Sequence, residues 1–172
     1  MNVVQAFRPA GGEPMIDDKA LRGQLVKLLD FEEAHVGFDR AVKGIPARLR
    51  GKVPAGAEHS LWQLVEHLRI AQDDILEFCR TAKYKEKKWP DDYWPASPAP
   101  RSASAWTKAI AAYRRDRKAF QRLAADTKRD LFATIPHGTG QTYLREILLA
   151  ADHAAYHIGQ IVAVRRLLGI WP

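Results

Sequence analysis

The chain has 172 residues, of which 47% are hydrophobic and 27% are charged, and its net charge is +7. This length suits a single domain, and the composition excludes a disordered chain or a fibrous repeat. No uninterrupted apolar run approaches ~20 residues, so we expect no membrane-spanning helix and no membrane partner. The single cysteine, Cys79, cannot form an internal disulfide and suits a reducing compartment. The N-terminus also lacks the apolar core of a signal peptide, and together these features predict a cytoplasmic protein.

The excess positive charge lies in stretches that also contain acids. The densest basic stretches, residues 83–88 and 114–118, contain or adjoin Glu86, Asp91 and Asp116. Such mixed stretches are typical of solvated helix faces, with a polyanion-binding surface as the alternative. We therefore expect no nucleic-acid partner.

The N-terminal part of the chain divides into a tail and a first helix. Residues 1–16 include Gly11-Gly12 and show no helical periodicity, so we expect a flexible tail there and a folded domain over residues 17–172. Asp17 or Asp18 is positioned to cap a first helix that continues to about Gly44. The apolar residues of this helix recur at helical spacing and are Leu21, Leu25, Leu28, Leu29, Phe31, Phe38 and Val42.

A second helix is predicted from Ser60 to about Arg80. Ser60 is followed three residues later by Gln63, which is the pattern of a capping box. The proline-rich segment 89–101 cannot form a long helix. We expect it to be an ordered crossover that is packed by its aromatic residues, Trp89, Tyr93 and Trp94.

Two further helices complete the predicted fold. The third runs from Ser102 or Ser104 to about Ala125, and the fourth, capped by Thr139 or Thr142, runs to about residue 168. Four long helices, one long crossover and no strand pattern predict an all-α four-helix bundle.

Two histidines of the last predicted helix, His153 and His157, are four residues apart, which places both imidazoles on one helix face. Because the chain has six histidines, such a pair alone is a weak indication of a site. A hydrogen bond in the core for one ring and solvent around the other would explain the pair equally well.

His67 adds a third imidazole, from an inward stripe of the second helix that includes Leu64 and Ala71. Burying a neutral imidazole without a partner costs on the order of 1–3 kcal/mol, and one shared metal ion would satisfy three rings at once. The set therefore predicts a divalent transition metal site, for Zn, Ni or Fe, with His67, His153 and His157 as ligands. Three protein ligands leave a coordination position for water or a substrate.

Two segments around these histidines resemble the DinB-like superfamily: S-L-W-Q-L-V-E-H-L over residues 60–68 and A-D-H-A-A-Y-H-I-G-Q-I over residues 151–161. The resemblance spans residues 17–172 and implies a metal-binding four-helix bundle. It also implies that His67, His153 and His157 hold the divalent metal, and all three positions match the pattern of the family. A homodimer is possible within this family, but no sequence feature determines the oligomeric state.

The resemblance implies a reaction class as well. Members of the wider group with known activities use the metal to activate a low-molecular-weight thiol, such as mycothiol or bacillithiol, for transfer or isomerisation. We accordingly expect a metal-dependent thiol S-transferase with a small-molecule substrate, its catalytic and cofactor-binding residues unassigned. Two alternatives stay open, a metal-dependent hydrolase and a non-enzymatic binding module with a structural metal.

Other polar residues are secondary candidates. His35 is expected to face inward from the first helix, His59 to be exposed, and His137 to lie at the mouth of the bundle. Glu146 and Gln160 lie on the ligand face of the last helix, where either could contact bound water or the imidazoles. The ordinary polarity of a helix surface explains these two residues equally well.

Overall fold

The computed structural model describes residues 17–30 and 34–172, so the tail predicted over residues 1–16 and the apolar position Phe31 lie outside the described residues. The described chain is helical, with a single isolated bridge between Thr134 and Thr142. Its α-helices are α1 (Asp18–Leu28), α2 (Phe38–Val42), α3 (Leu61–Arg80), α4 (Ala103–Ala125) and α5 (Tyr143–Leu167).

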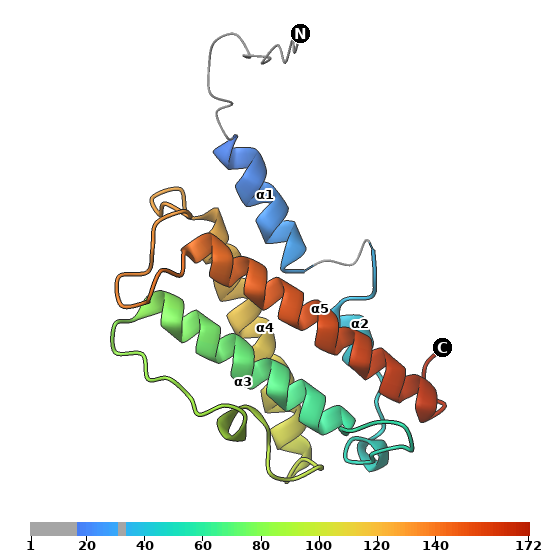
Figure 1. The fold of residues 1–172 in the computed structure, drawn as a ribbon. Coiled ribbons are helices and arrows are strands. Elements are labelled where there is room, and N and C mark those ends of the chain that lie inside the picture. Colours follow the sequence, from blue (N-terminus) through green and yellow to red (C-terminus); the bar gives the residue numbers. More distant parts are fainter. Residues whose placement is uncertain (1–16, 31–33) are drawn as a thin grey trace, which may run out of the picture.

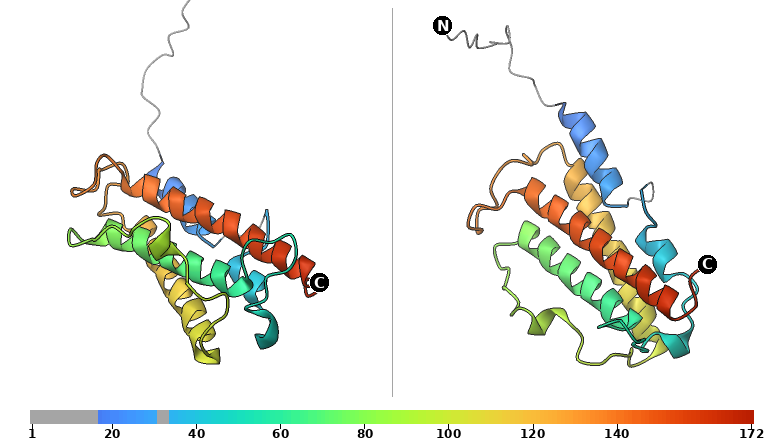
Figure 2. Two further views of the ribbon diagram at one scale, coloured as in Figure 1. Left: turned by 60° about the horizontal axis from the view of Figure 1, so that its bottom comes forward. Right: turned by 45° about the vertical axis from the view of Figure 1, so that its right-hand side comes forward.

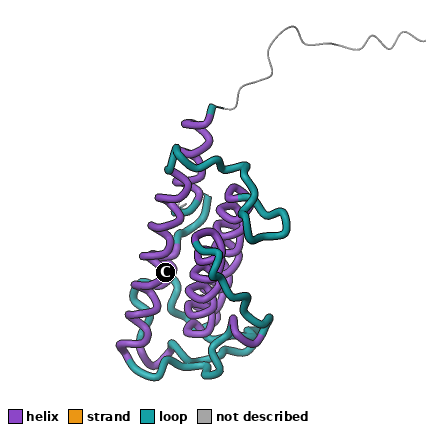
Figure 3. Tube along the Cα trace, turned by 90° about the vertical axis from the view of Figure 1, so that its left-hand side faces the viewer, coloured by secondary structure: helices purple, strands orange, loops and turns teal. Residues whose placement is uncertain are grey.

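The long helices form a bundle. Helices α3 and α5 lie side by side, α4 crosses behind them, and α1 continues the bundle beside the C-terminal end of α4 (Figures 1 and 2). Figure 3 shows a chain of helices joined by loops. The longest of the connections between α-helices is the one from α3 to α4. The predicted all-α bundle with one long crossover is confirmed.

The ends of α3 and α5 follow from local sequence signals. The Ser60 hydroxyl accepts a hydrogen bond from the backbone N–H of Gln63, and the Gln63 side chain accepts one from the backbone N–H of Ser60. This capping box satisfies two N–H groups that the helix itself cannot pair. At the start of α5, Thr142 rather than Thr139 is the cap, since its hydroxyl accepts from the N–H of Arg145.

The predicted continuous first helix is wrong. Helix α1 ends at Leu28, and a separate short helix, α2, begins at Phe38 after Gly37. Apolar periodicity could not locate this break, because the buried residues Leu25 and Phe38 reach the core from either side of it.

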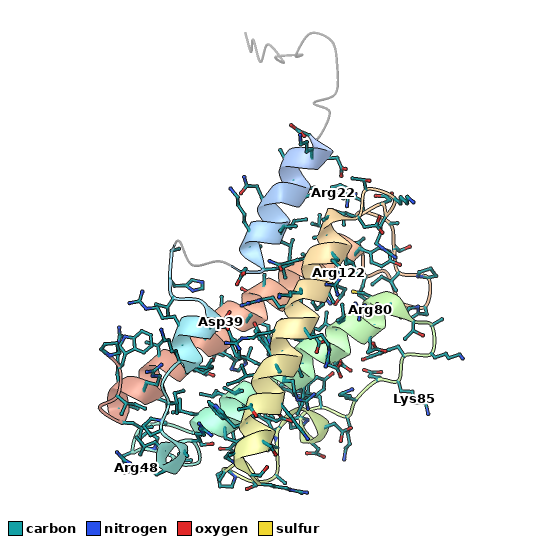
Figure 4. The ribbon with its side chains drawn as sticks, turned by 180° about the vertical axis from the view of Figure 1, so that it is seen from behind. Arg22, Asp39, Arg48, Arg80, Lys85 and Arg122 are labelled. Atoms are coloured by element: carbon teal, nitrogen blue, oxygen red, sulfur yellow. The ribbon has the colours of Figure 1, made fainter. Side chains whose placement is uncertain are left out.

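A buried arginine of α4 braces the two sides of the break. The guanidinium of Arg117, only 8% exposed, forms ion pairs with Asp30 after α1 and with Asp39 of α2, both at 2.8 Å. Figure 4 shows Asp39 on α2 beside α4, with Arg22 near the far end of α4, where its guanidinium donates to the carbonyl oxygens of Ala124, Asp126 and Arg129. Arginine contacts therefore attach both N-terminal helices to α4.

The break also corrects the position of His35. This residue lies in the loop before α2 and is exposed, whereas the predicted helix placed it in the core. Its ring Nδ1 lies 3.0 Å from the carbonyl oxygen of Val36.

The crossover between α3 and α4 is ordered, with a single turn of 3-10 helix at Asp91–Tyr93. Tyr93 and Trp94 pack against the bundle as predicted, but Trp89 is 68% exposed, so its expected packing role is wrong. Proline excludes regular helix along this segment and lets it run across the bundle surface.

The core has two apolar clusters, one at each end of the bundle, with polar residues between them. On α3 the first cluster ends at Leu68 and the second begins at Leu76; on α5 the corresponding residues are Ile158 and Ala151. The buried polar residues in or next to this middle layer are His67, Gln72, Asp74, Asp116, Arg117 and His157. A polar middle layer is expensive to bury, which marks this level of the bundle as a candidate site.

Helix α5 crosses both clusters and has the composition that this position requires. By length and hydropathy α5 is apolar enough to cross a membrane, and no other helix among the described residues meets these two criteria. Its buried face, however, packs against α3 and α2, and residues such as Ile147 and Ile161 are fully buried there. Its hydropathy is therefore explained by its position in the core of the bundle.

Candidate metal centre

Three imidazoles meet between α3 and α5 in the polar middle layer. The Nε2 atom of His67 lies 3.0 Å from Nε2 of His153 and 3.1 Å from Nε2 of His157. One nitrogen from each ring falls within 4.8 Å of the other two, and no other such group of histidine, cysteine and acidic residues occurs in the part of the chain that the structure describes. The tertiary structure thus brings together the three residues that the sequence singled out.

The hydrogen bond made by Nδ1 of His67 determines which nitrogen of this ring carries the proton. Nδ1 lies 2.9 Å from the backbone carbonyl oxygen of Tyr93, which can only accept a hydrogen bond. Nδ1 therefore carries the proton, and Nε2 of the neutral ring presents a lone pair to the other two histidines.

His157 is oriented in the same way. Its Nδ1 lies 2.7 Å from Oε1 of Gln160, one turn further along α5, and donates to that oxygen. Gln160 was predicted as a possible partner of the imidazoles, and this contact confirms it. The Nε2 atom of His157 therefore also presents a lone pair toward His67.

Lone pairs of two rings thus face each other across 3.1 Å with no proton between them. Protonation would relieve this repulsion, but burial disfavours the charged rings. Burial lowers the pKa of His67 from 6.5 to about 4 and that of His153 from 6.5 to about 3, and it lowers the pKa of His157 as well. A cation among the rings would satisfy the facing acceptors of His67 and His157.

The spacing of the nitrogens suits a transition metal ion. Nitrogens bound at ~2.1 Å to one ion lie ~3.0 Å apart in an octahedral arrangement and ~3.4 Å apart in a tetrahedral one. The separations from Nε2 of His67 to Nε2 of His153 and of His157, 3.0 and 3.1 Å, lie within this range. His67, His153 and His157, whose ligand nitrogens all lie within 4.8 Å of one another, therefore form a group that is able to hold a metal ion.

An aromatic sandwich covers His67. The Trp94 ring stacks on the His67 imidazole at 3.9 Å with an interplanar angle of 2°, and the His59 ring stacks on Trp94, also at 3.9 Å. His59 is half-buried by this stack, so the prediction of an exposed histidine is wrong. The stack shields the His67 side of the cluster from water.

A buried carboxylate of α3 fastens the crossover over the site. Asp74 Oδ2 accepts hydrogen bonds from the hydroxyls of Tyr93, at 2.6 Å, and Tyr84, at 3.2 Å. Its Oδ1 accepts no hydrogen bond from the described residues, although the Lys87 ammonium lies 3.2 Å away. Burial and the Asp74 carboxylate raise the pKa of Tyr84 to about 12 and also raise the pKa of Tyr93.

Sequence reasoning missed Asp74 and the role of Tyr93 toward His67. Tyr93 reaches His67 through its backbone carbonyl, which no side-chain motif reveals, and meets Asp74 through its hydroxyl. The one available signal was an acidic residue, Asp74, seven positions after His67, which places both on the same face of the helix.

A cavity of about 620 Å³ opens beside the cluster and extends away from it along α3 and α5. His67 and His153 line one end, and His137, Arg145 and Glu146 line the other. His137 lines this cavity, with its Nε2 2.8 Å from the carbonyl oxygen of Phe78, and its predicted position at the mouth of the bundle stays a prediction. Glu146 is buried and pairs with Arg145 at 2.6 Å rather than with an imidazole.

The chain was compared with known protein families, curated proteins and solved structures. The sequence profile of the DinB superfamily matches residues 30–161, which include all three histidines of the cluster. No curated protein and no solved structure matched. Because the profile covers most of the chain and the fold is the expected helical bundle, the protein belongs to the DinB superfamily.

Proposed function

We propose that the protein binds a divalent transition metal ion through His67, His153 and His157 and uses it to activate a low-molecular-weight thiol for S-transfer. The observation that carries the metal proposal is the contact between Nε2 of His67 and Nε2 of His157, where neither ring has a proton to share. Membership of the DinB superfamily agrees with a histidine-bound metal.

The bound ion would favour the thiolate form of a coordinated thiol, which is the nucleophilic form. The residues of the chain would hold and shield the reacting group. Tyr93 and Gln160 fix the orientation of His67 and His157, and Trp94 covers one side of the cluster. The cavity beside His153 provides room for the thiol and an electrophile.

The metal is tested by mass spectrometry on protein purified without a histidine tag, followed by titration of metal-free protein with Zn²⁺, Ni²⁺ and Fe²⁺. We expect one ion per chain and loss of that ion in His153→Ala. A protein that is isolated without metal and binds none of the three ions contradicts the proposal.

The reaction is tested with the metal-loaded protein, a panel of thiols and an alkylating electrophile. We expect thiol consumption that needs both the metal and His67. Turnover of esters or amides in the absence of thiol would instead identify a hydrolase. Metal binding with neither reaction would identify a binding module with a structural metal.

A further inference from the structure

The cavity beside the histidine cluster has two chemically different ends. His153 and Glu146 both line it, and both belong to α5. They are seven residues apart, so at 1.5 Å per residue they are separated by about 10 Å along the helix axis. A ligand that fills this cavity from the cluster to Glu146 must be elongated.

The distant end is rich in hydrogen-bond acceptors. Glu146, only 2% exposed, receives one hydrogen bond, from Arg145 to Oε1, and no described residue donates to Oε2. The Nε2–H of His137 donates to the Phe78 carbonyl oxygen, and in this tautomer Nδ1 is an acceptor to which no described residue donates. Two acceptors therefore await a donor at this end.

The charges on the cavity wall also favour a ligand that donates hydrogen bonds and carries positive charge. The wall carries three carboxylates, from Asp74, Glu86 and Glu146, against two cations, the Arg145 guanidinium of the wall and the Lys87 ammonium 3.2 Å from Asp74 Oδ1. The whole chain, by contrast, has a net charge of +7. An acidic cavity in a basic protein selects for a cationic group through Coulomb attraction that is stronger away from bulk water.

We infer that the ligand of this cavity is an elongated amino thiol, whose thiol lies at the histidine cluster and whose ammonium group lies between Glu146 and His137. This inference rests on the proposed function for its thiol end and on the acceptors of the cavity for its amine end. The apolar middle of the cavity, at Ile75 and Leu149, suits the chain that joins the two groups.

The test compares three octanethiols that differ only in the terminal group, which is an amine, a hydroxyl or a carboxylate. At ~1.2 Å per bond of an extended chain, the nine bonds from sulfur to the amine nitrogen span about 11 Å. Titration calorimetry on zinc-loaded protein should show the aminothiol binding about tenfold tighter than the hydroxythiol, and the carboxythiol binding weakest. Equal affinities, or a preference for the carboxylate, would overturn the inference.

Single substitutions test whether the preference for the terminal amine depends on Glu146. Glu146→Gln should abolish the preference for the amine, whereas Glu77→Gln, which alters an exposed carboxylate of α3 outside the cavity, should keep it. Arg145→Gln, at a half-exposed side chain, should increase the preference because it removes the opposing charge. Aminoethanethiol is too short to span both ends and should bind Glu146→Gln and the unaltered protein equally well. A preference that survives Glu146→Gln and is unchanged in Arg145→Gln contradicts the placement of the amine.

A separate measurement distinguishes failure of the inference from failure of the proposed function. If zinc-loaded protein binds none of the thiols, the thiol proposal fails, and octylamine is then titrated into metal-free protein with the His137 ring signals followed by NMR. A saturable shift that Glu146→Gln abolishes supports the amine site by itself. The absence of a shift overturns it.

Discussion

His67 and His157 face each other through Nε2 atoms 3.1 Å apart, although in each ring Nδ1 is the nitrogen that donates a hydrogen bond. The donors are committed to the carbonyl of Tyr93 and the side chain of Gln160. Two lone pairs therefore point into the same small volume, and a cation is the simplest group that satisfies both.

Metal binding should stabilise the fold. Zinc at about 100 times its dissociation constant should raise the free energy of unfolding by about 2.7 kcal/mol, because the ion binds the assembled cluster and not the separated helices. Urea denaturation with and without zinc measures this gain. The gain should vanish in His153→Ala and persist in His35→Ala, since His35 lies outside the cluster. An equal gain in both variants would place the ion elsewhere.

Gln160 should tune the affinity for metal without being a ligand. Gln160→Leu removes the acceptor that holds His157 Nδ1 at 2.7 Å, and we expect metal affinity to fall about 10- to 100-fold. Gln160→Glu keeps an acceptor at the same reach and should retain the affinity. Competition with a metallochromic indicator measures both variants, and similar losses in the two would argue against a role for this hydrogen bond.

The two tyrosines that donate to Asp74 should differ in how much each contributes to the free energy of unfolding. Tyr93→Phe removes the 2.6 Å hydrogen bond and should cost about 1.5 kcal/mol of unfolding free energy, because the carboxylate is buried. Tyr84→Phe removes the 3.2 Å bond and should cost about 0.5 kcal/mol. Chemical denaturation of metal-free protein separates these costs. The reverse order would mean that the shorter contact does not hold the crossover.

The metal-free protein should lose stability as the pH falls. The pKa of His67 drops from 6.5 to about 4 on folding and that of His153 from 6.5 to about 3, so below pH 6.5 the unfolded chain binds protons that the folded chain does not. Unfolding is therefore favoured progressively from pH 6.5 down to about 3, with the contribution of His67 complete near pH 4 and that of His153 near pH 3. Denaturation curves recorded across this pH range measure the free energy of unfolding. In the double variant His67→Ala, His153→Ala, this free energy should depend less on pH.

Arg117, which pairs with residues on both sides of the break between α1 and α2, should contribute more to the stability of the fold than Arg114. Arg117→Met removes the buried partner of Asp30 and Asp39 and should cost about 1–2 kcal/mol. Arg114 also pairs with Asp39, but its side chain is 48% exposed, so Arg114→Met should cost much less. Thermal denaturation of the two variants compares them, with equal losses as the contradicting result.

The sequence by itself determined the elements whose signals are local. The capping box of Ser60 and Gln63, the proline-rich crossover and the helical spacing of His153 and His157 each depend on residues within a few positions of one another. Local backbone geometry translates such patterns directly into structure, so helices α3, α4 and α5 and the candidate ligands could be predicted.

Only the tertiary structure decided the features that join distant segments. Arg117 braces α1 and α2 from α4, Asp74 holds the crossover, and the Tyr93 carbonyl sets the tautomer of His67 across 26 positions of sequence. Periodicity carries no information about such contacts, because it describes one helix face and not what lies opposite. The three histidines could be named from sequence, but the conflict between their lone pairs arises only when the helices pack.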